Sequence, residues 1–228
     1  MVPGEELLLN TVSLVTNLSF YGPGANEPAA PLPDRDHGAG FKRHEVLCGH
    51  LVKVLLHPNA EAVAEAARAF GNFSRDPSCR AAIAERRGDE VLVALLGHPC
   101  REVVFAAAGA IVNLAGDRAG RARLSGEEVG AGERLARLVR RAGLADPGMA
   151  GLACQALHNL LMVEEPPPGG GHGGALRDVL GGPEAYNKLW WTLQELTEAC
   201  SWEGRSVGGQ PGQSRDELGG FLAAAKAV

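Results

Sequence analysis

The sequence has few aromatic residues and lacks the short motifs that mark common enzymes. Phe, Trp and Tyr together make up 5% of its 228 residues. It contains no GxSxG, P-loop or HExxH pattern. The glycine-rich stretch 126–132 lacks the strand context that a nucleotide-binding fingerprint requires. We therefore expect a protein that is not an enzyme and that uses no cofactor.

An excess of positive charge and a long apolar run are also missing. The formal net charge is −5, whereas nucleic-acid binding needs clustered positive charge. No apolar run approaches the ~18 residues of a membrane span, and the N-terminus lacks a secretion signal. The sequence thus predicts a cytoplasmic protein that binds neither nucleic acid nor membrane.

The cysteines form no CxxC pair, and their number is odd. They are Cys48, Cys79, Cys100, Cys154 and Cys200. This pattern is typical of reduced thiols in an intracellular protein. His44, Cys48 and His50 lie close together, but no second cluster accompanies them, so we expect structural roles and no metal site.

Most of the excess glycine and proline falls in three stretches, 22–40, 163–174 and 203–214. Such composition cannot bury enough apolar area to offset chain entropy. These stretches divide the chain into a partial repeat (1–21), a disordered insertion (22–40), a repeat region (41–162), a linker (163–182), a C-terminal helix (183–202) and a mostly disordered tail that could hold a short helix (203–228).

Four alanine- or leucine-rich segments end in an asparagine followed by a large apolar residue. The asparagines are Asn17, Asn72, Asn113 and Asn159, with spacings of 55, 41 and 46 residues. The first spacing is longer by about the length of the insertion. A period of about 40–47 residues with two or three helices per unit is typical of armadillo and HEAT repeats.

Aligning the segments on the asparagine predicts one apolar face per helix. Positions −9, −6, −5, −2 and +1 cluster on one side at about 100° per residue. They read Leu8-Thr11-Val12-Val15-Leu18, Val63-Ala66-Ala67-Phe70-Phe73, Val104-Ala107-Ala108-Ile111-Leu114 and Ala150-Ala153-Cys154-Leu157-Leu160. We therefore predict an all-α, right-handed armadillo-type solenoid with about three full repeats, a partial N-terminal repeat and a C-terminal capping helix.

The opposite face, at positions 0, −4, −7 and −11, is largely polar and supplies the candidate binding residues. They are Asn17, Asn72, Asn113, Asn159, Ser13, Arg68, Gln155, Glu61, Glu65 and Glu102. An amide carries donors and an acceptor, so a row of asparagines could bind the backbone of an extended protein segment. Glutamates outnumber Arg68 here, which favours a ligand with Lys or Arg. Alternatively, each asparagine caps its own helix or the following turn.

Residues 5–162 resemble armadillo repeats, whose third helices line a concave groove with an asparagine ladder. Importin-α-like members carry Trp four residues before the asparagine. Here those positions hold Ser13, Arg68, Gly109 and Gln155, so a nuclear-import receptor is not expected.

Three segments read together resemble armadillo proteins linked to cilium and flagellum assembly and to the delivery of radial spokes. They are Asn17 to Pro23, Ala69 to Asp76 and Tyr186 to Trp191. The resemblance implies an adaptor whose partner is an axonemal or transport complex.

Two other surfaces offer alternatives. Arg134, Arg137 and Arg141 belong to a basic region on the predicted convex side, which could dock an anionic partner or could simply be a solvated face. The helix over 183–202 could cap the repeats or bind a partner through Trp190, Trp191 and Trp202. A permanent structural subunit docked through these two surfaces is therefore the alternative function.

The first helix has no preceding partner for its apolar residues, among them Leu8, Val15 and Leu18. Either it caps the repeats or the full protein continues N-terminally. Capping elements carry a polar outer face, so we expect continuation.

Overall fold

A computed structural model describes residues 3–20, 37–126, 128–162, 180, 182–184 and 186–194. These residues form helices and turns with no strand among them. The helices are α1 (Pro3–Phe20), α2 (His37–Val54), α3 (Ala60–Phe73), α4 (Pro77–Glu85), α5 (Gly88–Leu95), α6 (Arg101–Leu114), α7 (Arg118–Leu124), α8 (Ala131–Ala142) and α9 (Pro147–Leu161). The all-α prediction is confirmed.

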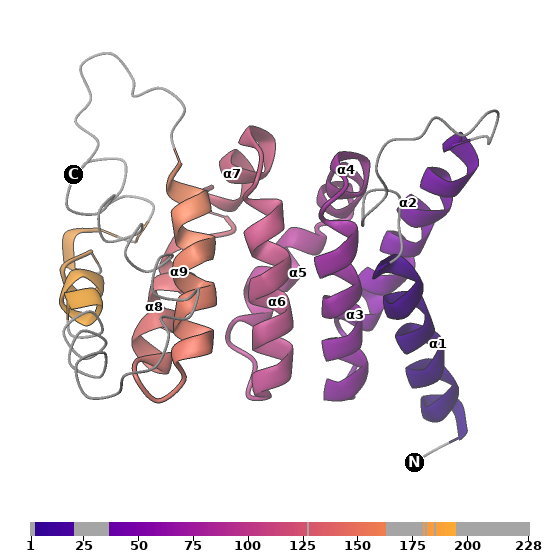
Figure 1. Ribbon diagram of the computed structural model, residues 1–228, viewed down its shortest axis with the longest axis horizontal. Coiled ribbons are helices and arrows are strands. Elements are labelled where there is room, and N and C mark those ends of the chain that lie inside the picture. Colours follow the sequence, from indigo (N-terminus) through magenta and orange to yellow (C-terminus); the bar gives the residue numbers. More distant parts are fainter. Residues whose placement is uncertain are drawn as a thin grey trace, which may run out of the picture. The chain divides into compact units, whose positions relative to one another are not determined.

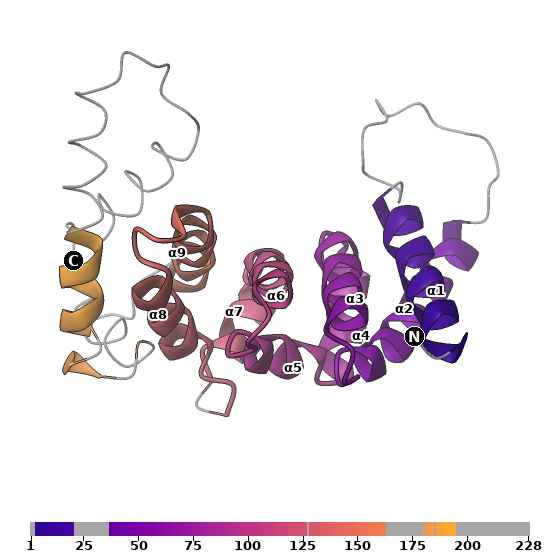
Figure 2. The same cartoon turned by 90° about the horizontal axis from the view of Figure 1, so that it is seen from below.

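The chain divides into two compact units, Met1–Leu114 and Ala115–Val228. In the first unit, α1, α3 and α6 lie side by side in that order (Figure 1). Helix α2 packs against α3 and α4, and α5 packs against α4 and α6 (Figure 2). In the second unit, α8 packs along α9, and α7 also contacts α9.

The turn after each of α3 and α6 is built from the same parts. Asp76 and Asp117 act as N-caps of the next helix, where their carboxylates accept backbone N–H groups. Arg80 Nη1 donates to the carbonyls of Ser74 and Arg75, and Arg121 repeats this on Ala115 and Gly116. These bonds satisfy carbonyls that the end of a helix leaves unpaired.

The predicted apolar columns are buried throughout α3, α6 and α9. The Cys154 thiol lies in one of these columns, and its burial raises its pKa to about 12. Because neighbouring positions in these columns are mostly alanine, the long helices can approach closely.

Helix α1 departs from this register, so its predicted apolar face was partly wrong. Leu9 and Val12 are buried, whereas Thr11 and Leu18 are exposed. The reason is that α1 turns the side carrying Thr16 towards α3, where the Thr16 hydroxyl bonds the backbone of that helix.

Several predicted segments lie wholly or partly outside the described residues, including 22–36, 163–179 and 203–228. Helix α2 begins at His37, so positions 37–40, which were assigned to the insertion, are helical. Within the predicted C-terminal helix, 183–184 and 186–194 are helical; Leu189 and Leu193 are buried and Trp191 is 63% exposed. No described helix is long and apolar enough to cross a membrane.

Candidate functional site

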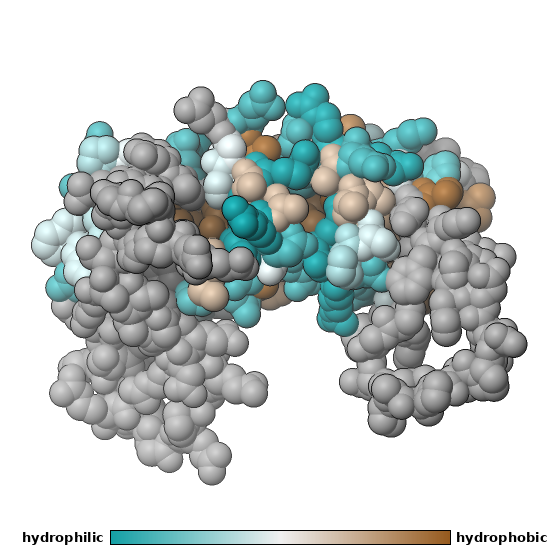
Figure 3. Space-filling model, turned by 90° about the horizontal axis from the view of Figure 1, so that it is seen from above, coloured by the Kyte–Doolittle hydropathy of each residue, from teal (hydrophilic) through white to brown (hydrophobic). Residues whose placement is uncertain are grey.

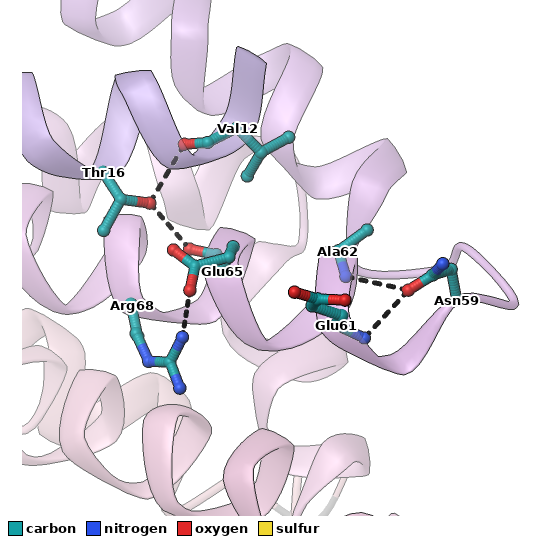
Figure 4. Close-up of polar contacts among 7 residues, drawn as sticks. All are labelled: Val12, Thr16, Asn59, Glu61, Ala62, Glu65 and Arg68. Carbon is teal, nitrogen blue, oxygen red and sulfur yellow. Dashed lines mark hydrogen bonds and ion pairs between the residues drawn. The ribbon is translucent and has the colours of Figure 1, made fainter. Parts of the chain in front are cut away.

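Helix α3 provides the centre of the candidate site, and its first turn is fixed by a cap. Asn59 Oδ1 accepts hydrogen bonds from the backbone N–H of Glu61 at 2.9 Å and of Ala62 at 3.2 Å. Figure 4 shows the cap next to the exposed Glu61 carboxylate. The cap therefore holds Glu61 at the start of the polar face.

The amides of Asn72 and Asn113 tie neighbouring long helices together. Asn72 Nδ2 donates to Thr16 O at 3.2 Å and to Ser19 Oγ at 3.0 Å. Asn113 Nδ2 donates to Gly71 O at 2.8 Å. In both cases the accepting carbonyl belongs to the residue immediately before the preceding asparagine of the row. These bonds run between helices. The alternative that each asparagine caps its own helix or the following turn therefore does not describe the Nδ2 bonds of Asn72 and Asn113.

The same bonds divide each amide into a used and an open side. Both half-buried asparagines donate through Nδ2, and no described residue donates to Oδ1 of either one. A carbonyl oxygen in this state can accept an N–H from an extended chain. Asn72 and Asn113 thus offer acceptors more readily than donors.

Sequence reasoning missed Thr16, Ser19 and Gly71 as partners of the asparagine row. Two of the three acceptors are backbone carbonyls, which every residue carries, so no side-chain signal could identify them. Gly71 is not needed for space, because nothing lies within 4 Å of a Cβ built there.

One ion pair occupies the middle of the polar face of α3. Arg68 pairs with Glu65 one turn earlier, with side-chain exposures of 46% and 18%. The single Thr16 hydroxyl proton is shared between two carbonyl oxygens, Glu65 O at 3.0 Å and Val12 O at 3.1 Å from Oγ1 (Figure 4). Since Glu65 already balances Arg68, the charge left on this face is that of Glu61 and of Glu102 on α6.

Glu102 remains ionised at neutral pH. The Cys100 thiol donates to Glu102 Oε2 at 3.1 Å, and this bond is the largest cause that lowers the pKa of the carboxyl. Its own backbone N–H and the charges of Arg101 and Arg68 lower it further. Arg68 therefore influences a carboxylate on the next long helix of the same unit.

The remaining predicted residues occupy three other places. Ser13 is half-buried and Asn17 is exposed on α1, and in the second unit Gln155 and Asn159 are half-buried on α9. Arg134, Arg137 and Arg141 are exposed on α8, opposite its buried leucines, and Arg137 pairs with Glu133. Hydrophilic side chains predominate among the described residues on the face shown in Figure 3. In the described part of the chain, no group of three or more His, Cys, Asp or Glu side chains could hold a metal ion.

No family model matches the sequence. The chain is 30% identical to armadillo repeat-containing protein 2 of Bos taurus over 155 residues and 30% identical to that of Mus musculus over 157. Each match covers 68% of this chain and 16% of the relative. The chain therefore spans about a sixth of the length of these relatives.

Solved structures share the fold at low sequence identity. A designed armadillo repeat protein in complex with the peptide (KR)4 superposes with a TM-score of 0.57 at 17% identity, covering 98% of this chain and 95% of the other. A computationally designed armadillo repeat protein for modular peptide recognition gives 0.58 at 18%, covering 98% and 99%. The chain therefore has an all-α armadillo-type solenoid fold, and over two thirds of its length its sequence resembles armadillo repeat-containing protein 2.

Proposed function

We propose that this chain is a non-enzymatic adaptor that binds an extended, basic protein segment in the armadillo groove. The observation that carries the proposal is the open Oδ1 of Asn72 and Asn113, one on each of two neighbouring long helices. Each can accept a backbone N–H of the ligand, and the exposed Asn17 on α1 extends the row within the same unit. Backbone bonds of this kind give affinity with little dependence on ligand sequence.

The charge preference rests on three carboxylates that border the row. Glu61 and Glu102 are exposed, and Glu65 is half-buried and pairs with Arg68. Opposite charges mainly raise the association rate and select the partner. The designed neighbour bound to (KR)4 supports the assignment, because that peptide consists of Lys and Arg.

Binding of a labelled (KR)4 peptide, measured by fluorescence anisotropy, tests the charge preference. We expect Glu61→Gln with Glu102→Gln to weaken binding by roughly three- to tenfold at low salt, because two exposed carboxylates face the ligand. Glu85→Gln is the matched control, since Glu85 is also an exposed helical glutamate but lies outside the site. Equal affinity of the site variant and the control would refute the basic-ligand assignment.

The asparagines are tested separately because their amides also hold the helices together. The double variant Asn72→Ala with Asn113→Ala should bind the (KR)4 peptide more weakly than the unmodified chain. The measurement is made at a temperature where circular dichroism shows the variant still folded. Unchanged affinity of the folded double variant would remove the groove from the binding mechanism.

We place this interaction in the cytoplasm and the cilium or flagellum, in axoneme assembly such as radial spoke transport. The support is the resemblance of the three motifs described above, and the partner would be an axonemal or transport complex. Neither nucleic acid nor membrane is part of the proposal, since the net charge is −5.

The alternative is a permanent structural subunit docked through the arginine face of α8 and the C-terminal helix. Three exposed arginines on one helix face favour it. Arg137→Glu with Arg141→Glu, compared with the Asn72/Asn113 double variant, discriminates in tagged proteins recovered from flagellated cells. Loss of axonemal incorporation only with the arginine variant would establish the structural role.

A further inference from the structure

The arginine face of α8 has no counterpart on the equivalent helix of the first unit. Arg134, Arg137 and Arg141 are exposed, and their spacing of three and four residues places them on one side of the helix. Helix α5 takes the same place before α6 as α8 does before α9, and it contains Asp89 and Glu90 but no basic residue. The arginine face is therefore not a part that the repeat requires.

The positive charge of this face is largely unbalanced. Glu133 is the one carboxylate in the sequence of α8, and it pairs with Arg137. Among the described residues, none pairs with Arg134, and Nη1 of the half-buried Arg140 has no hydrogen-bond partner. Four arginines and one glutamate give α8 a formal charge of +3, in a chain whose net charge is −5.

Stabilisation of the helix end explains only part of this charge. Positive side chains are favourable in the last turn of a helix, where backbone carbonyls are unpaired, and Arg140 and Arg141 lie there. Arg134 lies near the other end of α8, where a positive charge gains nothing from the helix dipole. An anionic partner accounts for an exposed arginine at that position.

The arginine face offers no apolar contact to a partner. Leu135, Leu138 and Val139 of the same helix are buried, and α8 packs along α9. A helix that binds a membrane surface needs an exposed apolar face, which α8 lacks. A partner on this face is therefore held by charge and hydrogen bonds.

The length of the face suits a short run of carboxylates. From Arg134 to Arg141 the helix rises by about 10 Å, and side chains on one side of an extended chain repeat about every 7 Å. Two or three glutamates can therefore meet the face, and a guanidinium group binds a carboxylate through two parallel hydrogen bonds. Nucleic-acid binding commonly uses more contacts, on the order of six to ten phosphates.

We propose that the arginine face of α8 is a second binding site, which holds a short glutamate-rich segment of another protein. The groove proposed for the basic segment lies in the first unit and α8 lies in the second, so one chain can bridge two partners of opposite charge. The bridging role rests on the function proposed above, whereas binding of the acidic segment does not. Because exposed charges carry this contact, it is reversible and sensitive to salt, unlike permanent docking.

Fluorescence anisotropy of a labelled octaglutamate peptide with the 228-residue chain tests the site. Arg134→Gln with Arg141→Gln should weaken binding by roughly tenfold at low salt, because two ion pairs are lost. Arg75→Gln with Arg118→Gln is the matched control, since both arginines are exposed outside α8 and the same charge is removed. No binding by the unmodified chain up to about 100 µM, or equal weakening by the two variants, overturns the proposal.

The two sites are separated by exchanging variants and peptides. Glu61→Gln with Glu102→Gln should bind octaglutamate at least as tightly as the unmodified chain, and the α8 variant should bind (KR)4 at least as tightly. Loss of (KR)4 binding alone refutes the groove and the bridging role, whereas loss of octaglutamate binding alone refutes the acidic site. Tighter binding of an oligothymidylate of equal charge than of octaglutamate would overturn the assignment to a protein segment.

Discussion

Helices α3 and α6 are two versions of one design, and their differences separate architecture from binding surface. Both follow a His-Pro pair, and in both the imidazole Nδ1 accepts a backbone N–H two residues later, from Asn59 at 3.1 Å and from Cys100 at 3.0 Å. Both end in an asparagine amide bonded to the preceding long helix. The features shared by α3 and α6, the His-Pro turn and the asparagine amide, therefore hold the unit together.

The two helices differ in their first turn and on their polar face. Asn59 caps α3, whereas the equivalent Cys100 bonds the Glu102 carboxylate instead. The polar face carries Glu61, Glu65 and Arg68 on α3 but Glu102, Ala106 and Gly109 on α6. The differences between the two helices are thus concentrated in the first turn and on the polar face that we propose as the binding surface.

The largest effect is expected in the shared core. Phe70 and Ile111 occupy the same position and are fully buried. Phe70→Ala should lower the free energy of unfolding by about 3–5 kcal/mol and Ile111→Ala by about 2–5, because each leaves a cavity. Urea unfolding followed by circular dichroism measures both. A loss below about 1 kcal/mol in either would contradict the close packing described.

Replacing Asn72 or Asn113 should give the next largest losses of stability, and the two losses should differ. Asn72 donates two hydrogen bonds and Asn113 donates one. At about 1 kcal/mol for each bond, Asn72→Ala should cost about 2 kcal/mol and Asn113→Ala about 1 kcal/mol. Urea unfolding measures both losses. A larger loss for Asn113→Ala than for Asn72→Ala would show that the number of hydrogen bonds does not determine the stability that each asparagine contributes.

The difference in capping between α3 and α6 can be tested by removing the cap of α3 and by adding one to α6. Asn59→Ala should destabilise the protein by about 1 kcal/mol through loss of the cap. Cys100→Asn should stabilise it by up to about 1 kcal/mol, since the new side chain can cap α6. Cys100→Ala serves as the control for removing the thiol. Destabilisation by Cys100→Asn would mean that the bond to Glu102 contributes more than a cap.

The smallest effect is expected at the ion pair of α3. The Arg68 side chain is 46% exposed, so solvent screens the pair and Glu65→Gln should change stability by about 0.5 kcal/mol or less. Glu133→Gln removes the comparable pair with Arg137 on α8 and is the control. A loss well above 1 kcal/mol for Glu65→Gln alone would indicate a role in packing α1 against α3.

The sequence predicted the repeat because periodic burial leaves a clear pattern in side-chain type. The columns around Phe70, Ile111 and Leu157 could be read directly. The register of α1 could not, since Leu7, Leu8 and Leu9 are adjacent and all apolar. Packing against α3 decides which of them is buried, and that depends on tertiary contacts.

The candidate site was predictable only in its residue types. An asparagine column is visible in the sequence, but Asn72 and Asn113 donate to main-chain carbonyls of the preceding long helix, and Asn72 also to a serine hydroxyl there. The ion pair between Arg68 and Glu65 follows from their i,i+3 spacing on a helix and could have been inferred from the sequence. The influence of Arg68 on Glu102 requires the side-by-side placement of α3 and α6.

The Cys154 thiol makes the opening of the second unit directly observable. Because it is buried in α9 and its pKa is raised to about 12, it stays protonated and unreactive towards alkylating reagents while the helix is packed. It becomes reactive when the surrounding helices separate. The rate at which this sulfur is alkylated therefore reports how often α9 loses its packing, with no probe added to the protein.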